Sequence, residues 1–327
     1  MCTAFSWKAM DHYFGRNLDL DYHYDETVTL TPRAFPLPFR HKEAINHHFA
    51  IIGIATVVDG YPLYYDAMNE KGLCMAGLNF PGNAVYQKPK QALENIASFE
   101  LIPWILSQCE SVAATKQLLL KTNVCDCAFC KDFPPTPLHW IVSDSKGSIT
   151  VEPRNDGLAI IDNQIGVLTN NPPFEYHMHN LSNYMHLSPK TPHNAVTPSI
   201  TLEPYSLGMG GIGLPGDFSS ASRFIRCAFV KEHTRFGESE SDRITQVFHI
   251  LSAVAQFDGC VQTQRGYEKT IYSICCNATK GYFYYTTYNN RQITGIDMRK
   301  ENLCSADLIS YPLRLAQQIC FEKQKGI

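Results

Sequence analysis

The sequence predicts an α+β protein in which antiparallel β-sheet is covered by helices. Strand-like segments come in pairs joined by short turns, and amphipathic helical segments come in blocks between them. Strands and helices do not alternate one by one, as they do in proteins built on a parallel sheet. Hydrophobic residues make up 44% of the 327 residues and charged residues 18%, a balance that forms a sizeable core and excludes a disordered chain.

Three segments show a strand pattern and lie at residues 49–58, 139–151 and 272–288. The first is apolar and rich in β-branched side chains, as expected of a buried strand. Each of the other two has turn residues in its middle, at 144–147 and 278–281, and therefore predicts a hairpin. In the second hairpin, the neighbours Cys275 and Cys276 should point to opposite faces of the strand, so that only one of them is deeply buried.

Four segments show a helical pattern and lie at residues 98–108, 112–120, 219–231 and 244–255. Apolar side chains recur at i, i+3, i+4 and i+7 in the last segment, with Ser241 as its predicted N-cap, and Ser111 is the predicted N-cap of the second. Proline and glycine recur at 131–137 and 186–217, which we expect to be long surface loops. Since no repeat or linker divides the chain, residues 1–327 are expected to form one domain.

Charge and hydropathy narrow the class of partner. Lys plus Arg is 28 and Asp plus Glu is 31, so the net charge of −3 leaves no basic excess for binding nucleic acid. The N-terminus carries no basic segment followed by an apolar run, and the longest apolar stretch is far shorter than the ~20 residues of a membrane span. We therefore expect a soluble, cytoplasmic protein with neither a nucleic-acid nor a membrane partner.

Twelve cysteines are many for a cytoplasmic chain. Disulfide frameworks are typical of small secreted domains, so most of these thiols are expected to be reduced and buried. Cys125, Cys127 and Cys130 have a spacing compatible with zinc, and a zinc-binding module is the competing, non-enzymatic hypothesis. No second pair of cysteines follows to complete four ligands, which favours free thiols there.

Cys2 has the clearest chemical potential. An initiator Met before a small residue is normally removed, which would leave Cys2 with a free α-amine. The amine of an N-terminal residue has an ordinary pKa of about 7.7–8.0, so it can take the thiol proton near neutral pH. One residue would then supply both a nucleophile and its base.

The run at residues 14–19 follows closely and includes Arg16, Asn17 and Asp19. Burying charge without a partner is costly. The run is therefore either an ordinary exposed turn or a site in which Arg16 and Asp19 pair with each other near the start of the chain.

Three later stretches place an amide or a guanidinium among apolar neighbours and turn residues. They surround Asn79 (AGLNFP), Asn170 (LTNNP) and Arg223 (PGDFSSASRF). Asn side chains supply N–H donors for an oxyanion, and an Arg beside a thiol stabilises the thiolate.

Together, and in this order, these motifs resemble the choloylglycine hydrolase family of the N-terminal-nucleophile hydrolases. The resemblance runs from residues 1–3 to 296–298 and includes 68–73, 138–140 and 222–226. It implies a four-layer αββα sandwich, in which two antiparallel sheets lie between helical layers. The resemblance also implies a homotetramer, and a reaction that needs neither a metal nor an organic cofactor.

The resemblance implies a role for each candidate catalytic residue: Cys2 is the nucleophile, Arg16 and Asp19 position it and its amine, Asn79 and Asn170 lie near the oxyanion, and Arg223 lies beside the thiol. The implied reaction is hydrolysis of the amide in a bile salt conjugated to glycine or taurine. The alternative is penicillin V acylase activity. In this family an Asn at the position of Asn79 resembles the first type and a Tyr resembles the second.

The resemblance also places the substrate pocket among the loops near residues 20–24, 58–66 and 126–138. The predicted lining is apolar and aromatic, and consists of Leu20, Tyr61, Leu63, Tyr65 and Phe129.

Overall fold

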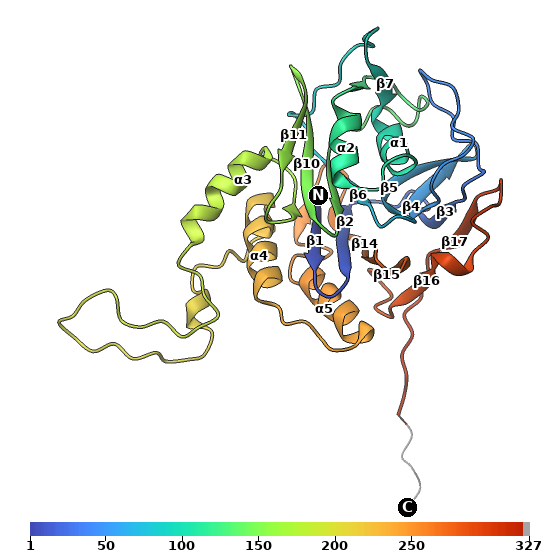
Figure 1. Cartoon of the computed structure of the whole chain (residues 1–327). Coiled ribbons are helices and arrows are strands. Elements are labelled where there is room, and N and C mark those ends of the chain that lie inside the picture. The colour runs from blue at the N-terminus through green and yellow to red at the C-terminus, as the bar shows by residue number, and fades with distance from the viewer. Residues whose placement is uncertain (323–327) are drawn as a thin grey trace, which may run out of the picture.

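Two antiparallel β-sheets lie face to face, and helices cover the outer face of each (Figure 1). The structure is a computed structural model and describes residues 1–322. The strand order in the first sheet is β12 (Val167–Leu168), β1 (Cys2–Lys8), β2 (His12–Leu20), β14 (Tyr267–Asn277), β15 (Tyr282–Thr287) and β16 (Thr294–Asp297), with β13 (Val261–Gln262) paired to β14. The order in the second sheet is β11 (Gly157–Asp162), β10 (Gly147–Arg154), β9 (Leu138–Asp144), β6 (Cys74–Asn79), β5 (Tyr61–Asn69), β4 (Ile51–Val58), β3 (Thr27–Thr31) and β17 (Ile309–Pro312). A separate pair, β7 (Glu94–Ala97) and β8 (Thr122–Cys125), is parallel.

The helices form the two outer layers. Their bounds are α1 (Leu101–Leu106), α2 (Val112–Leu119), α3 (Phe174–Leu181), α4 (Ser220–His233) and α5 (Glu240–Ser252), with short 3₁₀ helices at Ser98–Glu100, Ser182–Tyr184, Met209–Gly211 and Met298–Lys300. Helices α4 and α5 pack on the first sheet, whereas α1 and α2 pack on the second. The expected four-layer αββα sandwich is therefore confirmed, and so are the two predicted hairpins, β9–β10 and β14–β15.

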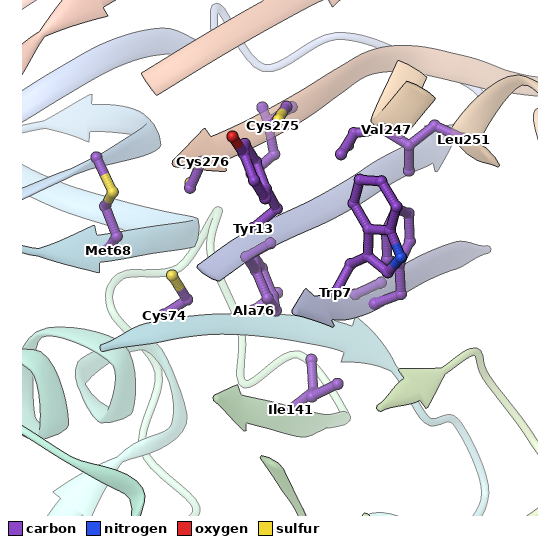
Figure 2. Close-up of a cluster of buried hydrophobic side chains, with 14 of the residues drawn as sticks. Trp7, Tyr13, Met68, Cys74, Ala76, Ile141, Val247, Leu251, Cys275 and Cys276 are labelled. Atoms are coloured by element: carbon purple, nitrogen blue, oxygen red, sulfur yellow. The ribbon is translucent and has the colours of Figure 1, made fainter. Parts of the chain in front are cut away.

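The first sheet is buried on both faces. In Figure 2, Ala76 of β6 and Ile141 of β9 lie on one side of β1 and β2, and Val247 and Leu251 of α5 lie on the other. A second apolar cluster lies between the second sheet and α1 with α2, around Trp140. This double coverage lets charged side chains of the first sheet face either the opposing sheet or the helices, shielded from water in both cases.

Because both faces of the first sheet are covered, Cys275 and Cys276 are both buried. Cys275 lies opposite Gly15, on the face that Val247 of α5 covers, whereas Cys276 faces the second sheet beside Cys74. The two side chains do point to opposite faces, as predicted. The expectation that only one would be deeply buried is wrong, because both are fully buried.

Residues 14–19 form most of β2 and are buried, so the reading of this run as an exposed turn is wrong. Strand β2 lies between β1 and β14. Its register with β1 sets Cys2 opposite Leu18 and Ala4 opposite Arg16. Because side chains alternate along a strand, Cys2 and Arg16 share the face that looks toward the second sheet.

The predicted helix starts are confirmed at two helices and shifted at a third. Ser111 caps α2 as predicted, and Ser219 caps α4. Helix α5 begins earlier than predicted, and its N-cap is Ser239 rather than Ser241. The reason is a reciprocal capping box, in which the Ser239 hydroxyl accepts from the Asp242 N–H and the Asp242 carboxylate accepts from the Ser239 N–H.

The predicted helix at 98–108 is shorter than expected and consists of one 3₁₀ turn followed by α1. The buried side chain of Asn69 donates to the carbonyls of Leu106 and Cys109, at 2.8 and 2.7 Å. These bonds satisfy carbonyls that have no partner at the end of a helix, so the chain can turn there.

Residues 131–137 and 186–217 are long loops, as predicted, with one 3₁₀ turn in the second. The loop between α3 and α4, yellow in Figure 1, extends away from the sheets. Its exposed large apolar side chains are Met185, Val196, Ile200, Leu202, Tyr205, Leu207 and Ile212. No helix within residues 1–322 is long and apolar enough to cross a membrane.

Gly53 of β4 permits a close approach to β5 where the register of these two strands shifts. A Cβ atom at this position would lie 2.0 Å from the carbonyl oxygen of Asp66 and 2.6 Å from the Cα of Ala67. Only glycine fits there, and the approach sets the backbone that carries the Asp66 side chain into the space between the sheets.

We expect Gly53→Ala to lower the free energy of unfolding by about 1–3 kcal/mol, because β4 and β5 must move apart. Urea unfolding followed by circular dichroism measures this. Gly147→Ala is the matched control, since a Cβ there meets nothing within 4 Å. Equal stability of the two variants would show that the strands separate at no cost.

Candidate active site

The Cys2 side chain lines a cavity of about 350 Å³. The walls come from β2, β5, β6 and the loop that precedes β9, and they consist of Arg16, Leu18, Leu20, Tyr22, Tyr24, Leu63, Tyr64, Tyr65, Gly77, Asn79, Ser98, Phe99, Phe129, Asp132, Phe133, Pro134, Pro135, Thr136, Pro137 and Leu138. Most of these residues are apolar or aromatic, and the groups able to do chemistry gather around Cys2. Cys2 itself is only 2% exposed.

Hydrogen bonds and an ion pair of the first two residues hold the start of the chain in the first sheet. The Met1 amine donates to the carbonyl of Asp19 at 2.8 Å and forms an ion pair with Glu268. The Cys2 N–H donates to Oδ1 of Asn170 at 2.7 Å. Burial lowers the pKa of the Met1 amine, although the nearby Cys2 and Asp19 oppose this shift.

Arg16 lies beside the thiol. Its Nη2 is 3.5 Å from the Cys2 Sγ and donates to the carbonyl of Gly77 at 3.0 Å. Its Nη1 donates to Asp66 of the second sheet at 2.7 Å and to Tyr272 of β14 at 2.5 Å. The predicted pairing of Arg16 with Asp19 is wrong, because residues three apart in a strand point to opposite faces.

Asp19 is fully buried on the helix side of β2. Its Oδ1 accepts from the Thr270 hydroxyl at 2.7 Å, and its Oδ2 has no hydrogen-bond partner within residues 1–322. Burial raises the pKa of this carboxyl group, and the amine at the chain start and Arg223 oppose the rise.

Arg223 reaches the site from α4 and is fully buried. Its guanidinium donates to the Cys2 carbonyl at 2.5 Å, the Thr3 hydroxyl at 2.6 Å and Oδ1 of Asn170 at 2.8 Å. None of its hydrogen bonds goes to the thiol. Arg223 thus bonds the main chain of Cys2 from the helix side of β1, whereas Arg16 makes the hydrogen bond to the thiol, and the expected effect of Arg223 on the thiol stays a prediction.

Asn79 and Asn170 differ in whether their side-chain amides already form hydrogen bonds. Asn170 uses Oδ1 for the Cys2 N–H and Arg223, and its Nδ2 donates to the main-chain carbonyl of Asn79 at 2.8 Å. The Asn79 side chain makes no hydrogen bond within the described part of the chain and lines the cavity. Asn79 is therefore the amide free to donate to a bound carbonyl, whereas Asn170 holds the Cys2 nitrogen.

Four of the five predicted lining residues do line the cavity: Leu20, Leu63, Tyr65 and Phe129. Tyr61 does not. Its ring packs against Phe99 and Phe129, which themselves line the cavity. Sequence reasoning missed Arg40, which donates to the carbonyl of Phe129 at 2.6 Å and lies over the Phe99 and Phe129 rings.

The three clustered cysteines do not form a metal site. Cys125 is buried and contacts Asn95 and Asn123, whereas Cys127 and Cys130 are partly exposed. Within residues 1–322, no group of three or more His, Cys, Asp or Glu side chains is arranged to hold a metal ion. The geometry thus gives the zinc-module hypothesis no support, and all twelve cysteines are free.

A buried cysteine at the start of β1, with its nitrogen held by an amide and an arginine at its thiol, in an αββα sandwich, defines an N-terminal-nucleophile hydrolase. The family model described as linear amide C–N hydrolases, choloylglycine hydrolase family, matches residues 2–311. The chain belongs to the choloylglycine hydrolase family.

Curated relatives are similar along nearly the whole length. The "Bile salt hydrolase/transferase" of Lactiplantibacillus plantarum is 51% identical over 319 residues, which cover 97% of this chain and 98% of that protein. A protein of the same name from Clostridium perfringens is 39% identical over 322 residues, or 95% of this chain and 96% of that protein.

Solved structures share the fold. A mutant of the conjugated bile acid hydrolase from Clostridium perfringens superposes with a TM-score of 0.91 at 36% identity, covering 99% of this chain and 100% of that one. Penicillin V acylase from Agrobacterium tumefaciens gives a TM-score of 0.75 at 18% identity, covering 96% and 92%. This second likeness concerns the fold alone.

The two arginines should differ in their effect on thiol reactivity. We expect Arg16→Gln to slow alkylation of Cys2 by iodoacetamide at pH 7 about tenfold, because the thiolate loses an adjacent charged donor. Arg223→Gln should slow it less, since Arg223 bonds the main chain. Peptide mapping by mass spectrometry isolates Cys2 from the eleven other thiols. A larger effect of Arg223→Gln would show that Arg223 rather than Arg16 stabilises the thiolate.

Proposed function

We propose that this chain hydrolyses the amide bond that joins a bile acid to glycine or taurine. The position of Cys2 carries the proposal: its thiol lines an apolar cavity while its nitrogen is held by Asn170. The curated relatives named for bile salt hydrolysis support the choice of substrate, since the most similar of those described above shares 51% of its residues with this chain.

The cavity suits a steroid amide. Its volume of about 350 Å³ lies in the range of ~300–1,000 Å³ that is usual for ligand sites. Aliphatic and aromatic side chains such as Leu20, Leu63 and Phe133 offer contacts for the fused rings. The scissile amide would then lie at the polar end, between the Cys2 thiol and the free side chain of Asn79.

Acylation begins with the α-amine that Cys2 carries once Met1 is removed. An N-terminal α-amine has an ordinary pKa of about 7.7–8.0, so part of it is neutral near pH 7 and can act as a base. The amine takes the thiol proton, and Arg16 stabilises the thiolate. Sulfur then attacks the amide carbonyl, a C–S bond forms, and the leaving amine departs with the proton that the α-ammonium returns.

Asn79 is the donor for the oxyanion that forms in this step. An oxyanion donor is typically worth about 10²–10³-fold in rate. In deacylation the neutral α-amine takes a proton from water and the hydroxide oxygen adds to the thioester carbonyl. The C–S bond then breaks, and the α-ammonium returns its proton to the sulfur. The products are the free bile acid and glycine or taurine, and the thiol is regenerated.

Penicillin V acylase activity is the second candidate, because the same nucleophile and fold would serve it. Asn79 favours the bile salt. An Asn side chain leaves the cavity wide enough for a steroid, whereas a Tyr at that position would narrow it and offer a ring suited to a phenoxyacetyl group.

We also propose that the chain acts in the cytoplasm as a homotetramer of single-domain subunits. The exposed apolar side chains of the loop between α3 and α4, which extends away from the sheets, support contact with another copy (Figure 1). Light scattering tests this, since the tetramer has four times the 36.9 kDa mass of one chain.

Substrate preference separates the two activities. We expect kcat/KM on glycocholate and on taurocholate to exceed that on penicillin V for the same preparation, because the cavity accommodates a steroid. Measuring released amino acid or phenoxyacetate gives all three values. Penicillin V as the best of the three would overturn the bile-salt proposal and leave the Cys2 mechanism intact.

Changes at Cys2 and at the N-terminus test the mechanism itself. We expect Cys2→Ala to reduce turnover at least about 10³-fold, as loss of a nucleophile does, with little change in unfolding temperature. A non-removable N-terminal extension should have the same effect, because it leaves no free α-amine on Cys2. Full turnover from protein that retains Met1, as shown by intact mass, would rule out the amine as base.

A further inference from the structure

We propose that Asp66 and Tyr272 are positioning residues that aim Arg16 at the Cys2 thiol. This inference rests on the proposed role of Cys2 as the nucleophile. The two residues lie outside every motif that carries the family resemblance, and neither lines the cavity. They act on the reaction through Arg16 alone.

The three side chains form a closed triangle of hydrogen bonds. Arg16 Nη1 donates to Asp66 Oδ2 at 2.7 Å and to the Tyr272 hydroxyl at 2.5 Å, and that hydroxyl donates to the same Asp66 oxygen at 2.6 Å. All three side chains are fully or almost fully buried. They come from β2, β5 and β14, so the triangle joins the two sheets across the space between them.

The triangle determines where the other nitrogen of Arg16 points. A guanidinium is planar, and its donors lie in a fixed fork. With Nη1 held by two acceptors, Nη2 is directed to the Gly77 carbonyl at 3.0 Å and the Cys2 Sγ at 3.5 Å. Loss of one acceptor on Nη1 would let the plane rotate and move Nη2 away from sulfur.

The triangle also keeps the charge of Arg16 in place. Burial disfavours the cation, yet Tyr272, Cys2 and Asp66 together raise the pKa of Arg16, so it stays charged beside the thiol. Asp66 in turn depends on Tyr272: its Oδ2 takes both strong bonds, and its Oδ1 has only a 3.5 Å contact with the Ile54 N–H. The tyrosine hydroxyl thus serves the cation and the anion at once.

The test removes only the hydroxyl. We expect Tyr272→Phe to lower kcat about tenfold with KM within twofold of wild type, because the ring stays and the cavity is untouched. Alkylation of Cys2 by iodoacetamide should slow by a similar factor. Tyr13→Phe is the matched control, since its buried hydroxyl bonds Glu240 on the helix side of β2, and this variant should match wild type in both assays.

A double-mutant cycle with Arg16→Lys shows whether the effect passes through Arg16. If it does, adding Tyr272→Phe to Arg16→Lys causes no further loss, because a lysine ammonium has no fork to aim. Losses that multiply, or a Tyr272→Phe variant with wild-type kcat and alkylation rate, would overturn the proposal. Should Tyr272→Phe fail to fold, Asp66→Asn gives the same comparison, with retention of wild-type rates counting against the triangle.

The alkylation arm keeps this test separate from the proposed function. If the wild-type chain hydrolyses none of the three substrates, the proposed function fails, while slower alkylation in Tyr272→Phe still supports the aim of Arg16 at the thiol. If hydrolysis proceeds and alkylation is unchanged in every variant, the positioning role fails alone.

Discussion

The burial of charge between and around two sheets is the constraint on which the rest of the site depends. Arg16, Arg223, Asp19 and Asp66 are all fully or almost fully buried, and each must find its partner within the protein. A lone buried charge is strongly destabilising. The helices over the first sheet, the close approach of β4 to β5 at Gly53 and the register of β1 on β2 all serve to bring these partners together.

Because side chains alternate along a strand, the two arginines act on opposite faces of β1 and have different roles. Along β1, the Cys2 side chain faces the second sheet and meets Arg16, whereas the next side chain, Thr3, faces the helices and meets Arg223. Arg223 therefore fixes the backbone and the amide that hold the nucleophile, and Arg16 acts on its sulfur. The alternation of side chains along β1 thus places the residue that holds the nucleophile on one face and the residue that activates it on the other.

Local pattern is enough to predict three strand segments, the two hairpins among them and four of the five α-helices within residues 1–322. The residues that gather at Cys2 are instead predicted from the family resemblance. Local pattern fails where a contact depends on what covers a face. Nothing near Arg16 in the sequence points to Asp66, which lies fifty residues further along the chain. The burial of both Cys275 and Cys276 likewise follows from layers that only the folded chain possesses.

The long loop between α3 and α4 divides the site between two stretches of chain. Cys2, Arg16 and Asn170 precede it, whereas Arg223 and Tyr272 follow it. A protease cut in this exposed loop would leave two polypeptides, with β14 of one still paired to β2 of the other. The site would then be formed by two fragments that are held together without a covalent link. Cys2 would regain its reactivity only when the two fragments reassemble from solution.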